Sequence, residues 1–355
     1  MIETAVLQAF PARKFHQEKI AGGINNAITG GGLSRIIFED DSIPRTVVAK
    51  VVPSFSTEQR VLAEILSNVG HAGLVNILRR YPDNRLGERE IGGYNFLNQA
   101  KVDFMPHLYF GQIGQGDEAS ELLIEDLSNC QTLDRLDNKD LLTQVLEQVI
   151  EKLAAFHQQF SPKSTQLLQE PWVGKWWLSP TSDFLSTEVA DYSLSACAEF
   201  IEDPEIMAIL SSLVRVRPAL WELYNSQSNT LIHWDMNPGN IMVSPKADFK
   251  VIDWQLAGWG VPQWDLAQLM TPFLGMFSVS EINEFINLYC QSRPSLDTNN
   301  FTSLYHLVVA DHSFRSSITV ILNGDPEGSE WKKCLDWVKV HKLSIGASLD
   351  QLGST

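Results

Sequence analysis

The stretch that decides the fold runs Leu231-Ile-His-Trp-Asp-Met-Asn-Pro-Gly-Asn-Ile-Met-Val243 and is followed by Lys250-Val-Ile-Asp-Trp254. It carries a His-x-Asp motif ending at Asp235, then Asn240 five residues later, then Asp253 after a second β-prone piece. Apolar residues flank each polar group, so short strands are expected with the polar residues in the turns between them.

These residue types suit phosphoryl transfer. An aspartate such as Asp235 orients an acceptor hydroxyl and accepts its proton, while an amide oxygen and a second carboxylate hold magnesium against phosphates. A hairpin with ordinary polar turn residues is the alternative interpretation, and a lone His-x-Asp motif would favour it. The complete spacing, with the residues at matching positions, favours a phosphoryl-transfer site.

Working outward, the chain changes character near residue 127. Before it, Arg45–Val52 follows the β-prone run that ends at Phe38, which predicts a hairpin. After it, apolar residues recur at intervals of three and four from Asp140 to Phe160, which predicts a long helix. Other predicted strands are 108–112 and 121–124, and other predicted helices are 57–69, 87–97, 205–224, 280–289, 301–322 and 331–349.

A glycine triplet, Gly30, Gly31 and Gly32, opens the first predicted strand. Glycines let backbone amides approach phosphates closely, and Ser34 can add a hydroxyl. Alone, such a triplet is more often a flexible turn. It matches neither G-x-x-x-x-G-K-[ST] nor G-x-G-x-x-G, which disfavours P-loop and Rossmann folds.

Together these motifs resemble the aminoglycoside phosphotransferase and choline kinase branch of the protein-kinase-like superfamily, and ecdysteroid-kinase-like members look most similar. The resemblance extends from Gly30 to about residue 265. It implies that Asp235 is the catalytic base and that Asn240 and Asp253 bind Mg²⁺. It also implies that His233 braces the catalytic loop.

Lys50, within Val47-Val-Ala-Lys-Val-Val52, is similar to the family's strand lysine that contacts the ATP phosphates. A lysine flanked by valines needs a partner, because an unpaired buried ammonium is unfavourable. The resemblance favours Glu90, which has a tyrosine four residues later, and Glu64 is the rival.

The piece Leu122-Leu-Ile-Glu-Asp-Leu127 resembles the hinge between lobes, where backbone groups of Glu125 and Leu127 would meet the adenine edge. Asp265 resembles a family aspartate that supports the site, and we treat it as structural. One departure stands out: Trp234 and Met236 occupy positions where many relatives have glycine and a leucine-like residue. The bulky Trp234 is expected to narrow the acceptor pocket without removing a catalytic group.

Composition limits the partners. The chain has 27 Lys plus Arg against 43 Asp plus Glu, a formal charge of −16, which repels nucleic acid and favours cationic small molecules. Four widely spaced cysteines, a start without signal-peptide order and the absence of a long apolar run favour a soluble cytoplasmic protein with no membrane partner. Tryptophans are frequent after residue 127, and core packing explains them better than a cation-binding cage.

We therefore expect an α+β, bilobal, protein-kinase-like fold, with a small β-rich nucleotide-binding lobe at 1–126 and a larger, mainly helical catalytic lobe at 127–355. The expected reaction moves the γ-phosphoryl group of ATP, with Mg²⁺, to a hydroxyl of a small molecule, which is cationic if the acidic excess has a role. A catalytically silent nucleotide-binding module is one alternative. A metal-dependent hydrolase that uses His233, Asp235 and Asp253 as ligands is another. An amino sugar, an amino alcohol, a sterol-like alcohol and a biosynthetic intermediate are all compatible with these motifs as acceptors.

Overall fold

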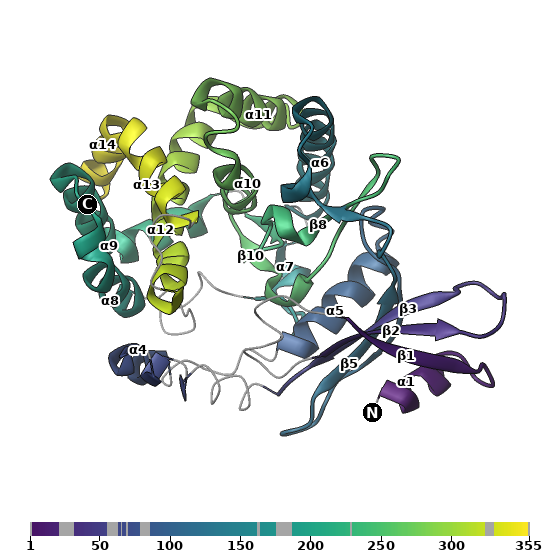
Figure 1. The fold of residues 1–355 in the computed structure, drawn as a ribbon. Coiled ribbons are helices and arrows are strands. Elements are labelled where there is room, and N and C mark those ends of the chain that lie inside the picture. Colours follow the sequence, from purple (N-terminus) through teal and green to yellow (C-terminus); the bar gives the residue numbers. More distant parts are fainter. Residues whose placement is uncertain are drawn as a thin grey trace.

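The computed structural model describes residues 2–20, 32–54, 63–64, 66–68, 70–78, 86–161, 164–174, 187–227, 229–323 and 330–353. They form a β-rich N-terminal part and a mostly helical remainder (Figure 1). The α+β fold class expected from the sequence is confirmed. Among the described residues, no helix is long and apolar enough to cross a membrane.

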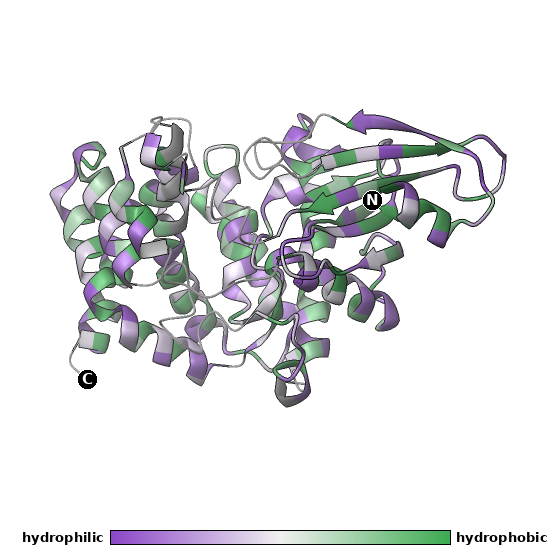
Figure 2. Ribbon diagram, turned by 90° about the horizontal axis from the view of Figure 1, so that it is seen from below, coloured by the Kyte–Doolittle hydropathy of each residue, from purple (hydrophilic) through white to green (hydrophobic). Residues whose placement is uncertain are grey.

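The N-terminal part is built on a five-stranded antiparallel sheet with the strand order β1-β2-β3-β5-β4. Its central strands are rich in valine, leucine and isoleucine, which suits a sheet covered on both faces. Figure 2 shows this concentration of apolar residues along the strands. The strands are β1 (Phe15–Ile20), β2 (Gly32–Phe38), β3 (Thr46–Val52), β4 (Leu108–Gln112) and β5 (Ser120–Glu125).

A helix lies on each face of this sheet. Helix α1 (Ile2–Ala9) packs on the face that includes Val47 and Ala49. Helix α5 (Leu86–Gln99) lies on the opposite face, toward the helical part (Figure 1). A Cβ on Gly92 of α5 would lie 2.4 Å from the Cβ of Trp172, so only glycine permits this close approach.

The helical part surrounds two small sheets that present the polar turns of the motif. One pairs β7 (Thr230–Ile232) with β10 (Gly258–Gly260), and the other has the order β6-β8-β9. Helix α6 packs on β7 and against α11, and α10 follows β10 in the chain. Helices α8, α9, α12, α13 and α14 form a second group farther from the N-terminal sheet (Figure 1). The remaining bounds are β6 (Gln131–Thr132), β8 (Ile241–Val243), β9 (Phe249–Val251), α4 (Ala72–Leu78), α6 (Lys139–Phe160), α7 (Ser164–Leu167), α8 (Thr187–Cys197), α9 (Pro204–Ser226), α10 (Gln263–Met270), α11 (Val279–Gln291), α12 (Thr298–Asn323), α13 (Glu330–Val340) and α14 (Lys342–Gly353).

The connection between α5 and β4 links the N-terminal part to the helical part. The Phe104 carbonyl accepts a 2.8 Å bond from the Val251 N–H in β9, and Lys250 Nζ donates to the Met105 carbonyl at 2.8 Å. The Phe104 ring also stacks with Phe249 at 5.9 Å between ring centroids. The division at residues 126 and 127 stays a prediction. This segment shows that residues before 126 already contact β9 of the helical part.

Two of the expected helices are not seen as single helices among the described residues. The single helix expected over 331–349 is wrong: the structure has two helices, α13 and α14, separated at His341. The break lets both Trp337 and Ile345 become fully buried, a packing gain that local helical periodicity cannot anticipate. The helix expected over 57–69 lies mostly outside the described residues.

Candidate active site

Lys50 lies between two carboxylates that come from distant parts of the chain. It neighbours Ala49 in β3, so its side chain points to the face of the sheet opposite α1. Its Nζ lies 2.8 Å from Glu90 Oε1 on α5 and 2.7 Å from Asp253 Oδ1 just after β9. Glu90, rather than the exposed Glu64, is therefore the partner that the structure provides.

Burial and charge act against each other in this cluster. Burial disfavours the charged ammonium of Lys50, but Asp253 and Glu90 outweigh it and raise the pKa of Lys50. Burial, helped by the Asp253 charge, raises the pKa of Glu90 to about 7, although Lys50 opposes the change. Only 1% of the Glu90 side chain is exposed, so this carboxylate depends on Lys50 for its charge balance.

The glycine-rich segment is only partly described. Gly30 and Gly31 lie outside the described residues, and Gly32 begins β2 opposite Val51. Ser34 pairs with Ala49 across the two strands, so it faces away from Lys50. Its Oγ accepts a 2.8 Å bond from Gln17 Nε2 on β1. The structure therefore does not bring Ser34 to the cluster, and we leave it out of the proposed site.

The turn after β7 holds Asp235 through its neighbour His233. The Asp235 N–H donates to His233 Nδ1 at 3.1 Å, so Nδ1 is an acceptor and the ring proton is on Nε2. Nε2 then donates to the Ile252 carbonyl at 2.9 Å, which ties the turn to the residue before Asp253. Both ring nitrogens of the fully buried His233 are used, which suits bracing of the loop.

Asn240 is oriented by Asp235. Its Nδ2 donates to the Asp235 carbonyl at 2.8 Å and to Asp235 Oδ2 at 3.1 Å. Both bonds use the amide nitrogen of Asn240 as the donor. The amide oxygen is therefore the atom of this side chain that is suited to bind a cation. The Ile252 N–H also donates to the Asn240 carbonyl at 2.9 Å, which joins the two turns.

Asp253 itself adopts a left-handed backbone conformation, with φ 65° and ψ 56°. Aspartate tolerates this region better than most residues, and a strained residue at the end of a strand is a common feature of functional sites. The next residue, Trp254, is fully buried and contacts the His233 ring at 4.5 Å between ring centroids. The conformation therefore directs the carboxylate toward Lys50 while its neighbour anchors the turn.

The donor set fits Mg²⁺, a hard cation that prefers carboxylate and amide oxygens and usually needs only a few of them from the protein. Asp253 would supply the carboxylate, and Asn240 would supply an amide oxygen. Within the described ranges no group of three or more His, Cys, Asp or Glu side chains could hold a metal ion, and both nitrogens of His233 are used. Because both nitrogens of His233 already have hydrogen-bond partners, His233 is not suited to be the metal ligand that the hydrolase alternative requires.

The predicted hinge is the end of β5 and the residues after it. The Glu125 N–H donates to the His107 carbonyl at 2.9 Å, and the Leu127 carbonyl accepts from the Cys130 N–H at 2.9 Å. A contact with an adenine edge would therefore have to use the Glu125 carbonyl and the Leu127 N–H. Between them, Asp126 Oδ2 accepts a 2.9 Å hydrogen bond from Arg35 Nε of β2. This bond links the hinge to the strand that follows the glycines.

Asp265, expected as a structural residue, lies at the first turn of α10 and is fully buried. Its Oδ2 accepts from the His233 N–H at 2.8 Å and its Oδ1 from the Trp234 N–H at 2.9 Å. Gln268, one turn later, accepts from the Met236 N–H at 3.1 Å. Gln268 was not predicted from the sequence, although its spacing of three residues from Asp265 places both on one side of a helix.

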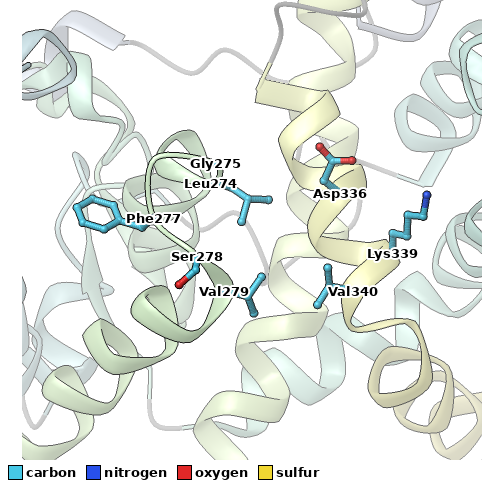
Figure 3. A pocket seen from close by; sticks show the side chains of 8 residues that line it. All are labelled: Leu274, Gly275, Phe277, Ser278, Val279, Asp336, Lys339 and Val340. Atoms are coloured by element: carbon cyan, nitrogen blue, oxygen red, sulfur yellow. The ribbon is translucent and has the colours of Figure 1, made fainter. Parts of the chain in front are cut away.

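A separate surface pocket of about 510 Å³ lies between the start of α11 and the end of α13. Figure 3 shows its lining, in which Leu274 and Val279 face Val340 across the gap. None of the predicted site residues lines it. We therefore assign it no part in the candidate site.

The fold, with Lys50, Glu90 and Asp253 meeting beside a His-x-Asp turn, defines a phosphotransferase of the protein-kinase-like class. The chain belongs to the phosphotransferase enzyme family, whose family model matches residues 75–298. This match confirms the aminoglycoside phosphotransferase and choline kinase branch expected from the motifs, while the likeness to ecdysteroid-kinase-like members stays a prediction. No curated protein has a significant sequence match to the chain.

Solved structures share the fold at low identity. The choline kinase LicA from Streptococcus pneumoniae is 14% identical, with 98% of each chain covered and a TM-score of 0.51. A putative aminoglycoside phosphotransferase from Ralstonia eutropha is 12% identical, with 99% of this chain and 97% of that chain covered and a TM-score of 0.55. A mutant of aminoglycoside 2'-phosphotransferase-IIIa, solved with GDP, is 13% identical, with 98% of each chain covered and a TM-score of 0.55.

Proposed function

We propose that this protein transfers the γ-phosphoryl group of ATP to a hydroxyl of a small molecule. The observation that carries the proposal is the convergence of Lys50, Glu90 and Asp253 from three separate segments at 2.7 and 2.8 Å. A nucleotide site needs a fixed cation for the phosphates and a carboxylate for magnesium, and this cluster supplies both. Among structures with the same fold, LicA has been solved with AMP, and the 2'-phosphotransferase mutant with GDP.

Each residue has a distinct proposed role. Lys50 contacts the phosphates, and Glu90 holds its ammonium in place. Asn240 and Asp253 hold Mg²⁺, which neutralises phosphate charge when bound. Asp235 orients the acceptor hydroxyl and takes up its proton, since its carboxylate is fixed by Asn240 at 3.1 Å.

The acceptor is proposed as a small alcohol, and its charge is a separate question. The described tryptophans Trp172, Trp254, Trp259 and Trp264 are at most 6% exposed, so they pack in the core and present no open ring faces. Trp176 and Trp177 lie outside the described residues, so among the residues that are described the excess of acidic side chains is the remaining support for a cationic acceptor. Added salt should weaken binding of a cationic acceptor, and a neutral or acidic best substrate would rule this part out.

The proposed compartment is the cytoplasm. Cys130, Cys197, Cys290 and Cys334 are all free, and three of them are buried. Unpaired thiols are usual in a reducing compartment. Fractionation of cells that express the full chain would test this location.

Two measurements test the activity. Calorimetry with Mg-ATP in the absence of an acceptor should show binding, because the nucleotide site is complete without one. A screen of hydroxylated metabolites, followed by mass spectrometry, should find a product heavier by one phosphoryl group. Binding without transfer to any alcohol would favour the catalytically silent module, and no binding at millimolar Mg-ATP would contradict the kinase function altogether.

A further inference from the structure

A buried hydrogen-bond chain runs behind the catalytic loop and ends at Asp265. His157 Nε2, on α6, lies 3.2 Å from Asp265 Oδ2, and His157 Nδ1 lies 2.8 Å from the Tyr289 hydroxyl on α11. Arg293 Nη1 donates to the same hydroxyl at 2.9 Å. His157, Asp265 and Tyr289 are fully buried and Arg293 is 4% exposed, so solvent does not share these bonds.

The donors and acceptors in this series of hydrogen bonds have one consistent order. Arginine can only donate, so Tyr289 accepts from Arg293 and directs its own proton to His157 Nδ1. The ring proton of His157 is then on Nε2, which donates to the Asp265 carboxylate. Burial and the nearby Arg293 charge lower the pKa of His157 despite Asp265, which agrees with a neutral ring.

Asp265 connects this chain to backbone that is under strain. Trp234 has φ 69°, in the left-handed region that a bulky residue rarely adopts because its backbone is strained there. The carboxylate of Asp265 holds the N–H groups of His233 and Trp234, immediately before Asp235. A small rotation of Asp265 would therefore change where the Asp235 carboxylate points.

We propose that His157 and Tyr289 are positioning residues for phosphoryl transfer, which act through Asp265 to hold the strained turn at Trp234 and thereby align Asp235. The inference rests on the proposed function, in which Asp235 is the base. It goes further because α6 and α11 supply no group of the nucleotide cluster, yet their buried side chains fix the geometry of the base.

Tyr289→Phe tests this role because it removes only the hydroxyl. Tyr305→Phe is the matched control, since Tyr305 is also fully buried in the helical part but lies on α12, outside this chain of bonds. We expect Tyr289→Phe to lower kcat about five- to tenfold, the size of one lost buried hydrogen bond. The KM for ATP should stay the same, since Lys50 and Asp253 are untouched, and the control should change neither value.

A second pair of variants separates positioning from packing. His157→Gln places an amide N–H near the position of ring Nε2 and can still donate to Asp265, whereas His157→Phe keeps the volume and removes the donor. The glutamine variant should therefore retain more turnover than the phenylalanine variant at similar melting temperatures. Equal turnover in the two would overturn the proposal.

Hydrogen exchange provides a readout that needs no acceptor. The amides of residues 233–236 should exchange faster in Tyr289→Phe than in the unmodified protein, and Tyr305→Phe should leave them unchanged. Unchanged exchange and unchanged kcat in Tyr289→Phe would overturn the inference. Faster exchange in a protein that phosphorylates no alcohol would support the coupling and count against the proposed function instead.

Discussion

Replacing Lys50 by methionine should destabilise the protein chiefly through Glu90. Methionine keeps most of the length of lysine but removes the ammonium that lies 2.8 Å from Glu90 Oε1 and 2.7 Å from Asp253 Oδ1. Asp253, with 20% of its side chain exposed, can be partly hydrated after the change. Glu90, with 1% exposed, cannot.

The size of the effect follows from these distances. At 2.8 Å and an effective dielectric constant of about 20, the Lys50–Glu90 attraction is about 6 kcal/mol, and desolvation of both ions opposes it. Removing one partner of a buried pair typically costs about 3–5 kcal/mol. With an unfolding entropy of about 2.1 cal/mol/K for each of 355 residues, this lowers the melting temperature by roughly 4–7 °C.

Two further variants show whether Glu90 is the cause. Adding Glu90→Gln to Lys50→Met removes the buried carboxylate charge that Lys50 no longer balances. The double variant should therefore be more stable than Lys50→Met alone. Lys152→Met is the matched control, because its ion pair with Asp103 is exposed and contributes about 0–1 kcal/mol.

The assay is thermal unfolding at pH 5.5 and pH 8. A carboxyl group whose pKa is raised on folding makes the folded protein less stable as the pH rises, because the folded state binds the proton more tightly than the unfolded state. Without Lys50 the pKa of Glu90 rises further, so the penalty in Lys50→Met should be larger at pH 8. A melting temperature equal to that of Lys152→Met, with no rescue by Glu90→Gln, would refute the argument.

Three further predictions concern chemistry and stability. Asp235→Asn should lower turnover by about 10²–10⁴ with nearly unchanged Mg-ATP affinity, whereas Asp253→Ala should impair both, as measured by kinetics and calorimetry; normal turnover in folded Asp235→Asn would contradict its role. Chelation of Mg²⁺ should stop turnover and leave the melting temperature of the nucleotide-free protein unchanged, because hydrogen bonds and ion pairs already hold the proposed ligands; full turnover in excess chelator would count against magnesium. Burial and the neighbouring His341 lower the pKa of His306 from 6.5 to about 3, so unfolding takes up a proton between these values and stability falls as the pH drops below 6.5. His306→Phe should therefore flatten the decline in melting temperature between pH 7 and pH 5, and exposed His16→Asn should not.

The sequence predicted the parts of the fold whose signals are local. The β-prone run of valines around Lys50 and the helical periodicity from Asp140 to Phe160 correspond to β3 and α6 within a residue or two. Strand β1 (Phe15–Ile20) was not predicted, because it is an exposed edge strand with the sequence FHQEKI, whose polar residues give no buried face.

The candidate site was predictable where motif spacing is short. Asp235 and Asn240 are five residues apart, and the structure joins them by hydrogen bonds. The buried hydrogen bonds behind Asp265 were missed because they join residues from separate parts of the chain. His157 lies on α6, Tyr289 lies on α11 and Arg293 follows α11, and neither helix alone encodes how the two helices pack. A signal existed for one of them: His157 falls on the apolar face of its helix, beside Leu153 and Phe160, where a polar group needs a buried partner.

The departure at Trp234 has an explanation different from the expected narrowing of the acceptor pocket. The ring is 1% exposed and meets Trp264 of α10 edge to face at 5.0 Å between centroids, so it lies in the core. Burying a tryptophan removes about 150–250 Å² from water, worth about 4–6 kcal/mol, which exceeds the roughly 1–3 kcal/mol of left-handed strain. Glycine would avoid the strain but would lose the anchor. In this chain a bulky residue therefore stabilises the same turn that Asp265 clamps, and the alignment of Asp235 depends on core packing as well as on hydrogen bonds.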